Sequence, residues 1–340
     1  MNRLVWLGGN NFELECRHSA APQPPPGQVA IRVKAVGICG TDIHIINGKY
    51  GLAKPPLVLG HEIAGEIEAV GAGVTRVRPG HRVTVDQVVG CGVCFFCRRG
   101  SAQFCDTGFE LGITRDGGCQ DFVLTPEQNV YPLPDTISYE EGAILDMEVW
   151  AALDKCGIRP GDSVLVLGHG PAGMVACQIA RAMGCGRVIL AGRSEARLKT
   201  AEGLGLADRY VPVRQQDLLE VVRGDTGGRG VDVVFECAGA PETAAAAVES
   251  AVSGGKVVFY GVQTAALERF DLNRIVLKDL TVFGALSDRR GWEEVIRLVE
   301  TGKLRLDVLI THRFPLDSAP SAYELVRSKA DGVVKAVLTL

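Results

Sequence analysis

The pattern of hydrophobic and polar positions changes twice along the chain. Up to about residue 148, short runs of alternating apolar and polar residues are separated by Gly and Pro turns, as in 28–36, 64–70 and 81–89. Alternation with a period of two residues is typical of strands that bury one face. This part of the chain therefore predicts a barrel-like β domain.

From about residue 149 to 285 the pattern becomes strand then helix, repeatedly. Short continuous runs of Val, Ile and Leu predict strands that are buried on both faces, and the amphipathic segments between them predict helices. The predicted strands are 163–168, 187–192, 231–239, 256–262 and 280–286, and the predicted helices include 173–184 and 195–205. This alternation indicates an α/β fold with a doubly wound parallel sheet.

The remaining residues, 286–340, contain a predicted helix at 292–302 and a predicted strand at 333–340. We expect this tail to return to the β domain. The prediction is therefore two domains, one made of 1–148 with 286–340 and the other of 149–285. A length of 340 residues with 46% hydrophobic residues is sufficient for two cores.

Composition narrows the class of protein. A formal net charge of −4 without a basic block makes nucleic acid an unexpected partner. No apolar run approaches the ~20 residues that span a bilayer, and the first residues do not form a signal or targeting segment. Eleven cysteines in such a chain indicate a reducing compartment. We expect a cytoplasmic enzyme with no membrane role.

Four of the cysteines form the run CGVCFFCRRGSAQFC, at Cys91, Cys94, Cys97 and Cys105. Their spacing lets each sulfur lie about 2.3 Å from a shared tetrahedral Zn²⁺, and four sulfurs leave no open position for a substrate. Disulfides and an iron–sulfur cluster are the alternatives, but disulfides between such close neighbours would be strained. We therefore predict a structural zinc that holds a lobe at about 88–108.

The run GHGPAG occupies Gly168 to Gly173, after a predicted strand and before a predicted helix. Glycines in such a turn let the backbone approach a pyrophosphate, and the start of the helix supplies N–H groups. In this context the motif predicts a dinucleotide site that includes Gly168, Gly170 and Gly173. We expect His169 to be a solvent-facing loop residue.

The end of the second strand of this domain reads RVILAGRSEARL. A carboxylate at the strand end favours NAD, whereas a small residue followed by Arg leaves room for the 2′-phosphate of NADP. The small residue is Gly192, with Arg193, Ser194 and Arg197 beside it. A guanidinium binds phosphate through two parallel contacts, so we favour NADP. NAD remains the alternative if a shift of the loop brings Glu195 into place.

A third set of residues lies in the β domain, where Cys39 and Thr41 occur in GICGTDIHI and His61 and Glu62 in LGHEIAG. A thiolate, an imidazole and a carboxylate are the ligands of a catalytic zinc that keeps an exchangeable position. Cys39 or His61 alone would more often be a packed core residue. Together, beside a closed site of four cysteines, they indicate a second zinc.

These motifs resemble those of the zinc-dependent medium-chain alcohol dehydrogenases, particularly the sorbitol and threonine dehydrogenase branch. The landmarks are GICGTDIH, GHEIAGEIEAVGAGV, the four cysteines, GHGPAG and RFPLDSAPSAYELV, so the similarity runs through the whole chain. The resemblance implies a GroES-like catalytic domain split around a Rossmann domain. It also implies a homodimer or homotetramer.

The resemblance assigns Cys39 and His61 as ligands of the catalytic zinc, with Glu62 either a ligand or just behind the metal. The remaining ligand falls in EEGAILDMEVW, where we favour Asp146 over Glu148. Further cofactor contacts implied by the resemblance are Pro171, Ala172, Ala238, Gly239, Gly261, Val262 and Leu286.

The expected reaction is reversible hydride transfer between a secondary alcohol and the nicotinamide, giving the ketone, with the alcohol oxygen activated by zinc. Thr41 and His44 are candidates for the proton relay. Thr41 could instead cap a helix, and His44 could contact a ribose or phosphate.

The branch points to a polyol, a cyclitol or an amino alcohol as substrate. Two alternatives are a zinc-independent quinone reductase-like NADPH oxidoreductase and a non-catalytic zinc or redox-sensing protein. Cys39 and His61 disfavour the first alternative, and the intact GHGPAG turn disfavours the second.

Overall fold

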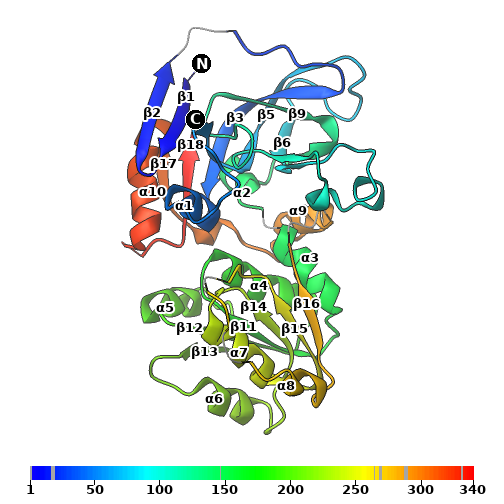
Figure 1. The fold of residues 1–340 in the computed structure, drawn as a ribbon, viewed down its shortest axis with the longest axis vertical. Helices are drawn as coiled ribbons and strands as arrows, with labels where there is room; N and C mark the ends of the chain where they lie inside the picture. The colour runs from blue at the N-terminus through cyan, green and yellow to red at the C-terminus, as the bar shows by residue number, and fades with distance from the viewer. Residues whose placement is uncertain are drawn as a thin grey trace. The chain divides into compact units, whose positions relative to one another are not determined.

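The computed structural model describes residues 2–16, 20–145, 147–263, 265–267, 270–286, 290–330 and 332–340 (Figure 1). The chain forms two compact units, which we describe separately. Unit 1 comprises Met1–Leu145, Trp292–Glu300 and Leu306–Leu340, and unit 2 comprises Asp146–Gly291 and Thr301–Arg305. Within the described residues, no helix has the length and apolar character needed to cross a membrane.

A seven-stranded sheet forms the centre of unit 1, with β3 (Gln28–Ile38) in its middle. β3 pairs antiparallel with three other strands of this sheet. Val33 is buried whereas Arg32 and Lys34 on either side of it are partly exposed, which confirms the predicted alternation. The other strands are β5 (Glu62–Val70), β6 (Arg82–Val85), β9 (Phe122–Pro126), β10 (Val130–Pro132), β17 (Ile310–Pro315) and β18 (Lys335–Thr339).

Smaller elements complete unit 1. The short strands are β1 (Asn2–Gly8), β2 (Asn11–Cys16) and β4 (Leu57–Val58) in one sheet, and β7 (Val88–Val89) with β8 (Phe109–Glu110) in another. The α-helices are α1 (Gly40–Ile46), α2 (Tyr139–Ala143), α9 (Trp292–Glu300) and α10 (Ala319–Ser328). The 3₁₀-helices are η1 (Cys97–Arg99), η2 (Ala102–Phe104), η3 (Glu127–Asn129), η4 (Asp307–Leu309) and η5 (Leu316–Ser318).

The run predicted to be β-like at 81–89 forms two strands, because the chain turns between β6 and β7. Asp86 accepts a hydrogen bond from the backbone N–H of Val88 at 2.9 Å, and its own N–H donates to Asn129 O at 2.8 Å. An Asp side chain that binds the backbone two residues on stabilises a turn. This turn directs the chain into the loop that carries the four cysteines.

The last strand, β18, lies between β3 and β17 in the sheet of unit 1. Its residues Ala336 and Leu338 pair with Ile38 and Val36 of β3 and are fully buried. The chain end therefore contributes directly to the core of unit 1.

Unit 2 contains a six-stranded sheet in which all neighbouring strands are parallel. The strand order is β13-β12-β11-β14-β15-β16, so the chain reverses direction across the sheet between β11 and β14. The strands are β11 (Ser163–Leu167), β12 (Arg187–Gly192), β13 (Arg209–Pro212), β14 (Val231–Glu236), β15 (Ala251–Phe259) and β16 (Thr281–Gly284). The prediction of a parallel sheet is confirmed, and ligands bind such sheets at this reversal point.

Helices alternate with these strands, as Figure 1 shows for α4, α5 and α7. They are α3 (Met147–Cys156), α4 (Pro171–Ala182), α5 (Glu195–Gly203), α6 (Leu218–Asp225), α7 (Pro241–Ser250) and α8 (Asn273–Val276). Leu165, Ile189 and Val234, on three adjacent strands, are fully buried in the core of unit 2. Because the strands are parallel, their carboxyl ends and the turns that follow them meet at one edge of the sheet.

Candidate functional site

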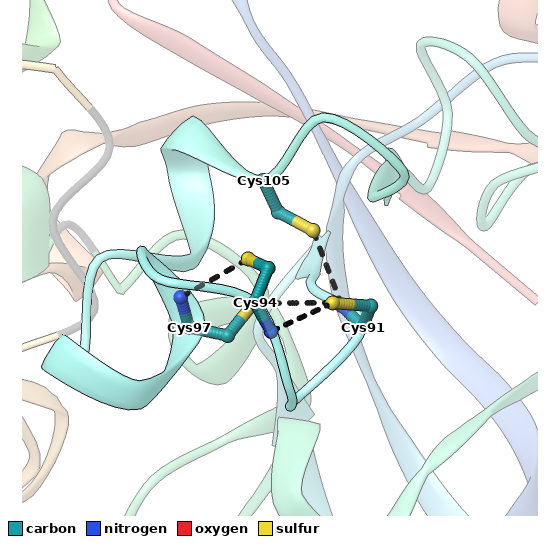
Figure 2. Close-up of side chains that lie close together, drawn as sticks. All are labelled: Cys91, Cys94, Cys97 and Cys105. Atoms are coloured by element: carbon teal, nitrogen blue, oxygen red, sulfur yellow. Dashed lines mark hydrogen bonds between the residues drawn. The ribbon is translucent and has the colours of Figure 1, made fainter.

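The cysteine cluster (Cys91, Cys94, Cys97 and Cys105) is gathered by η1, η2 and the turns around them. The four sulfur atoms all lie within 4.8 Å of one another, and Figure 2 shows their side chains converging. Backbone N–H groups of Cys91, Cys94 and Cys97 donate to sulfurs of Cys105, Cys91 and Cys94 at 3.3 to 3.4 Å. None of the eleven cysteines, all of which are described, is in a disulfide. The cluster therefore has the donors and the spacing of a closed tetrahedral zinc site.

Electrostatics in the cysteine cluster favour thiolates at some positions. The N–H of Cys91 lowers the pKa of the Cys105 thiol to about 6. Burial raises the pKa of Cys97 to about 12. A bound cation reverses such an increase, because a coordinating thiol is deprotonated. The donor set fits zinc better than it fits four neutral thiols.

Cys39, His61 and Glu62 form a second group, which we call the donor group. One ligand atom from each lies within 4.8 Å of the others. Cys39 follows β3, while His61 and Glu62 stand at the start of β5, and the antiparallel register pairs Gly37 with Glu62. A Cβ atom added to Gly37 would lie 1.9 Å from Glu62 Oε2, so glycine is required there for the carboxylate to take its position.

Asp42, on the first turn of α1, orients the donor group. It is fully buried, and its Oδ2 accepts a hydrogen bond from Cys39 N at 2.9 Å while Oδ1 lies 3.3 Å from His61 Nδ1. Burial would lower the pKa of His61, but the charge of Asp42 and the neighbouring Cys39 raise it well above its ordinary value. A carboxylate that holds one ring nitrogen of a metal-binding histidine leaves the other nitrogen for the metal.

Glu62 is held on one side only. Its Oε1 accepts a hydrogen bond from Lys335 Nζ at 2.6 Å. Its Oε2 is buried without a hydrogen-bond partner in the described part of the protein. An orphaned buried carboxylate oxygen is costly unless another ligand satisfies it. Because Glu62 also lies beside a thiol and an imidazole, a carboxylate with an unsatisfied oxygen at this position fits a zinc ion.

The other predicted residues near this site are placed as follows. Thr41 Oγ1 lies 3.8 Å from Cys39 Sγ, whereas His44 is exposed on α1. Asp146 lies outside the described residues. Glu148 begins α3 in unit 2, where its Oε2 lies 3.5 Å from the hydroxyl of Tyr260.

The GHGPAG run forms the turn between β11 and α4. Gly168 has a φ of +126°, and a Cβ atom added to Gly173 would lie 1.8 Å from Gly168 O, so both positions require glycine. Gly170 caps α4 without a side-chain hydrogen bond, Pro171 and Ala172 form its first turn, and a Cβ atom at Gly170 would meet open space. Glycine has no side chain that could cap the first N–H groups of α4, which suits binding of a phosphate at this helix start.

The loop after β12 contains the residues predicted to select the cofactor. Arg193 is exposed, while Ser194 and Arg197 are half-buried, and Ser194 Oγ accepts a hydrogen bond from Arg197 N at 3.4 Å. Burial lowers the pKa of Arg197. His169 is only partly solvent-facing, which corrects the sequence prediction. It is half-buried against Gly192.

Comparison with known proteins identifies the family of this chain. Residues 25–135 match the alcohol dehydrogenase GroES-like domain, and residues 171–301 match the zinc-binding dehydrogenase family. The chain is 36% identical over 322 residues to an L-threonine 3-dehydrogenase of Pyrococcus abyssi, with 92% of each chain covered. The chain belongs to the zinc-dependent medium-chain alcohol dehydrogenases.

Two further relatives are informative. A sorbitol dehydrogenase of Halalkalibacterium halodurans is 33% identical over 326 residues, with 94% of each chain covered. The structure of a putative zinc-binding dehydrogenase from Sinorhizobium meliloti, bound to NADP, has a TM-score of 0.91 at 32% identity and covers 100% of this chain and 99% of its own. The dehydrogenase thus combines a GroES-like domain with a Rossmann-like parallel sheet, as predicted.

The dehydrogenase also contains a buried carboxylate that sequence reasoning missed. Glu236, at the end of β14, is fully buried and its Oε1 accepts hydrogen bonds from Ala238 N at 2.8 Å, Gly239 N at 2.9 Å and Thr243 Oγ1 at 2.7 Å. It fixes the turn that carries two of the predicted cofactor residues. The only sequence signal was an acid at the end of an apolar strand.

The turn after β15 packs directly against the turn after β14. A Cβ atom added to Gly261 would lie 2.5 Å from Gly239 N, and one added to Gly239 would lie 2.3 Å from Val262 O. The side chains of Val262 and Leu286 are 76% and 55% exposed, so neither is used in the core of unit 2.

Lys335 is the second residue that was missed. Its side chain is 8% exposed and approaches Glu62 from β18, 273 residues away in the sequence. The sole hint was a single charge within the apolar terminal strand. Only the pairing of β18 with β3 brings it to the donor group.

Proposed function

We propose that this dehydrogenase is a zinc-dependent, NADP-preferring enzyme that interconverts a secondary alcohol and its ketone. The observation that carries the proposal is the donor group, in which Cys39, His61 and a carboxylate oxygen of Glu62 converge and Glu62 Oε2 has no hydrogen-bond partner among the described residues. In this proposal, residues 1–148 and 286–340 act as the catalytic domain and 149–285 as the cofactor domain. The cysteine cluster holds a second, structural zinc.

A zinc ion held by the donor group would supply Lewis-acid polarisation of an alcohol oxygen. The chain's own residues do the rest. Asp42 holds the His61 ring in one orientation, and Lys335 balances the charge of Glu62. Thr41 is the nearer of the two candidate relay groups, because its hydroxyl lies beside Cys39, and exposed His44 would pass the proton to solvent.

We propose Asp146 as the remaining ligand, with Glu148 as the alternative. Zinc content of the Asp146→Ala and Glu148→Ala variants decides between them. The variant that loses one zinc per chain identifies the ligand.

NADP preference is supported by the loop after β12. Glycine at 192 offers no carboxylate to a ribose 2′-hydroxyl, and Arg193 and Arg197 can neutralise a 2′-phosphate. In addition, Glu195 Oε1 accepts a hydrogen bond from Gln215 Nε2 at 2.6 Å, so the nearest acid is already engaged. Arg193→Ala should raise the KM for NADP far more than that for NAD, and an equal effect would reject the preference.

The substrate class we propose is a polyol, a cyclitol or an amino alcohol. It is supported by the carboxylate-containing donor group and by similarity to proteins named threonine and sorbitol dehydrogenases. A panel of these alcohols and simple secondary alcohols, assayed with both nicotinamides, tests the proposal. Retained turnover in Cys39→Ala or His61→Ala would remove the catalytic zinc from it, and two zinc ions per wild-type chain would support it.

We further propose a cytoplasmic homodimer or homotetramer. In unit 2 the edge strand β16 and the nearby helix α8 expose apolar side chains, including Val282 at 38%, Val276 at 70% and Leu277 at 83%. Contiguous exposed apolar patches mark association surfaces, and in this proposal these residues contribute to such a patch. Light scattering after size exclusion measures the mass, and a monomer would reject the proposal.

A further inference from the structure

The ring of His169 occupies the space beside Gly192 at the carboxyl end of β12. A Cβ atom added to Gly192 would lie 2.3 Å from His169 Cγ and 2.6 Å from Nδ1. Those separations are far below van der Waals contact, so any larger residue at 192 would displace the ring. The glycine that suggests NADP is therefore required by a histidine of the neighbouring turn.

The same ring also binds the loop after β12, which contains the residues predicted to select the cofactor. His169 Nε2 accepts a hydrogen bond from Ser194 N at 2.9 Å, and Ser194 Oγ in turn accepts one from Arg197 N at 3.4 Å. Because Nε2 is an acceptor, the neutral ring carries its proton on Nδ1. The two bonds join the turn after β11 to the first turn of α5, with Arg193 and Arg197 on either side of Ser194.

We propose that His169 is the positioning residue that sets selection at the 2′ position of the adenosine ribose. It excludes a carboxylate from position 192 and holds the Ser194 backbone so that the two arginines are presented to a 2′-phosphate. This inference rests on the proposed function as a dinucleotide-dependent dehydrogenase. Selection between NADP and NAD then depends on a residue of the GHGPAG turn as well as on the loop after β12.

Binding of adenosine fragments tests the proposal without any turnover. Calorimetry gives Kd values for 2′,5′-ADP and 5′-ADP with the wild-type chain, His169→Ala and His169→Gln. Gln retains a hydrogen-bond acceptor of similar reach, whereas Ala removes it. We expect His169→Ala to weaken 2′,5′-ADP binding by about three- to tenfold relative to 5′-ADP, the effect of one hydrogen bond. His169→Gln should keep the wild-type ratio within about twofold.

A second pair of variants tests the steric part. Gly192→Asp alone should weaken both fragments by more than about tenfold, because the carboxylate collides with the ring. In the His169→Ala background the same change should restore 5′-ADP binding and reverse the preference. Zinc content and thermal unfolding of each variant serve as controls for folding.

The possible outcomes distinguish failure of the proposed function from failure of the role of His169. A wild-type chain that binds neither fragment would reject the proposed function, and this inference with it. A wild-type chain that prefers 2′,5′-ADP, combined with an unchanged ratio in His169→Ala, would overturn only the role of His169. Equal tolerance of Gly192→Asp with and without His169 would overturn the steric argument as well.

Discussion

Replacing Lys335 by Met should destabilise unit 1, because it leaves the charge of Glu62 buried without its ion-pair partner. Lys335 Nζ lies 2.6 Å from Glu62 Oε1, and the two side chains are only 8% and 19% exposed. Met fills most of the volume of the lysine stem but offers no charge. The carboxylate then keeps its burial and loses the ion-pair partner that it has within the described part of the chain.

The magnitude follows from that burial. Removing one member of a fully buried pair costs about 3–5 kcal/mol. Since Glu62 retains some solvent contact, we expect about 2–4 kcal/mol for Lys335→Met. Lys54→Met is the matched control, because Lys54 is exposed in the same unit, and it should cost less than about 0.5 kcal/mol. Adding Glu62→Gln to Lys335→Met removes the unpaired buried charge and should recover at least half of the lost stability.

Hydrogen exchange is the appropriate assay, because a chain with two units need not unfold in two states. Protection of backbone amides in β5 and β18, measured on chelator-treated protein, reports the free energy of opening around the pair. The reasoning is refuted if Lys335→Met and Lys54→Met have the same effect. It is also refuted if the losses from Glu62→Gln and Lys335→Met simply add.

Three further predictions concern the metal sites. Cys94→Ser should lose one zinc per chain and lower the melting temperature, with metal analysis and calorimetry as the measurements; retention of both zinc ions would contradict a four-sulfur site. In zinc-free protein, the pKa of His61 in the folded state is raised above its ordinary value of about 6.5. Protonated His61 therefore stabilises the fold at pH values below about 6.5, and this stabilisation is lost as the pH rises through the raised pKa. Asp42→Asn should flatten this slope, and an unchanged pH profile of unfolding would exclude the pairing. Gly37→Ala should displace Glu62 and lower affinity for the catalytic zinc, whereas wild-type affinity would show that Glu62 is not a ligand.

Features whose geometry is local could be predicted from the sequence. The continuous apolar runs predicted all the strands of unit 2 except β13, and the alternating runs predicted the central strands β3, β5 and β18 of unit 1, since burial on one or two faces leaves its period in the sequence. The cysteine cluster and the GHGPAG turn were predicted because their residues lie within one loop or turn. The run at 81–89 did form strands, but its interruption was not predicted: the Asp86 side chain competes with the sheet for the backbone and divides the run into β6 and β7.

The sequence by itself determined the residue types of this dehydrogenase: two sets of candidate zinc ligands, a glycine-rich turn predicted to bind phosphate, and a glycine followed by arginine. Only the tertiary structure decided which groups act on them. Lys335 reaches Glu62, Glu236 fixes the turn at Ala238, and His169 fills the space beside Gly192. The contacts of Lys335 and His169 depend on the pairing or register of strands and turns that are separate in the chain, and the spacing of residues in a sequence carries no record of that register. Glu236 is close to its turn in the sequence, but only the structure shows that its side chain is buried and bends back to the backbone.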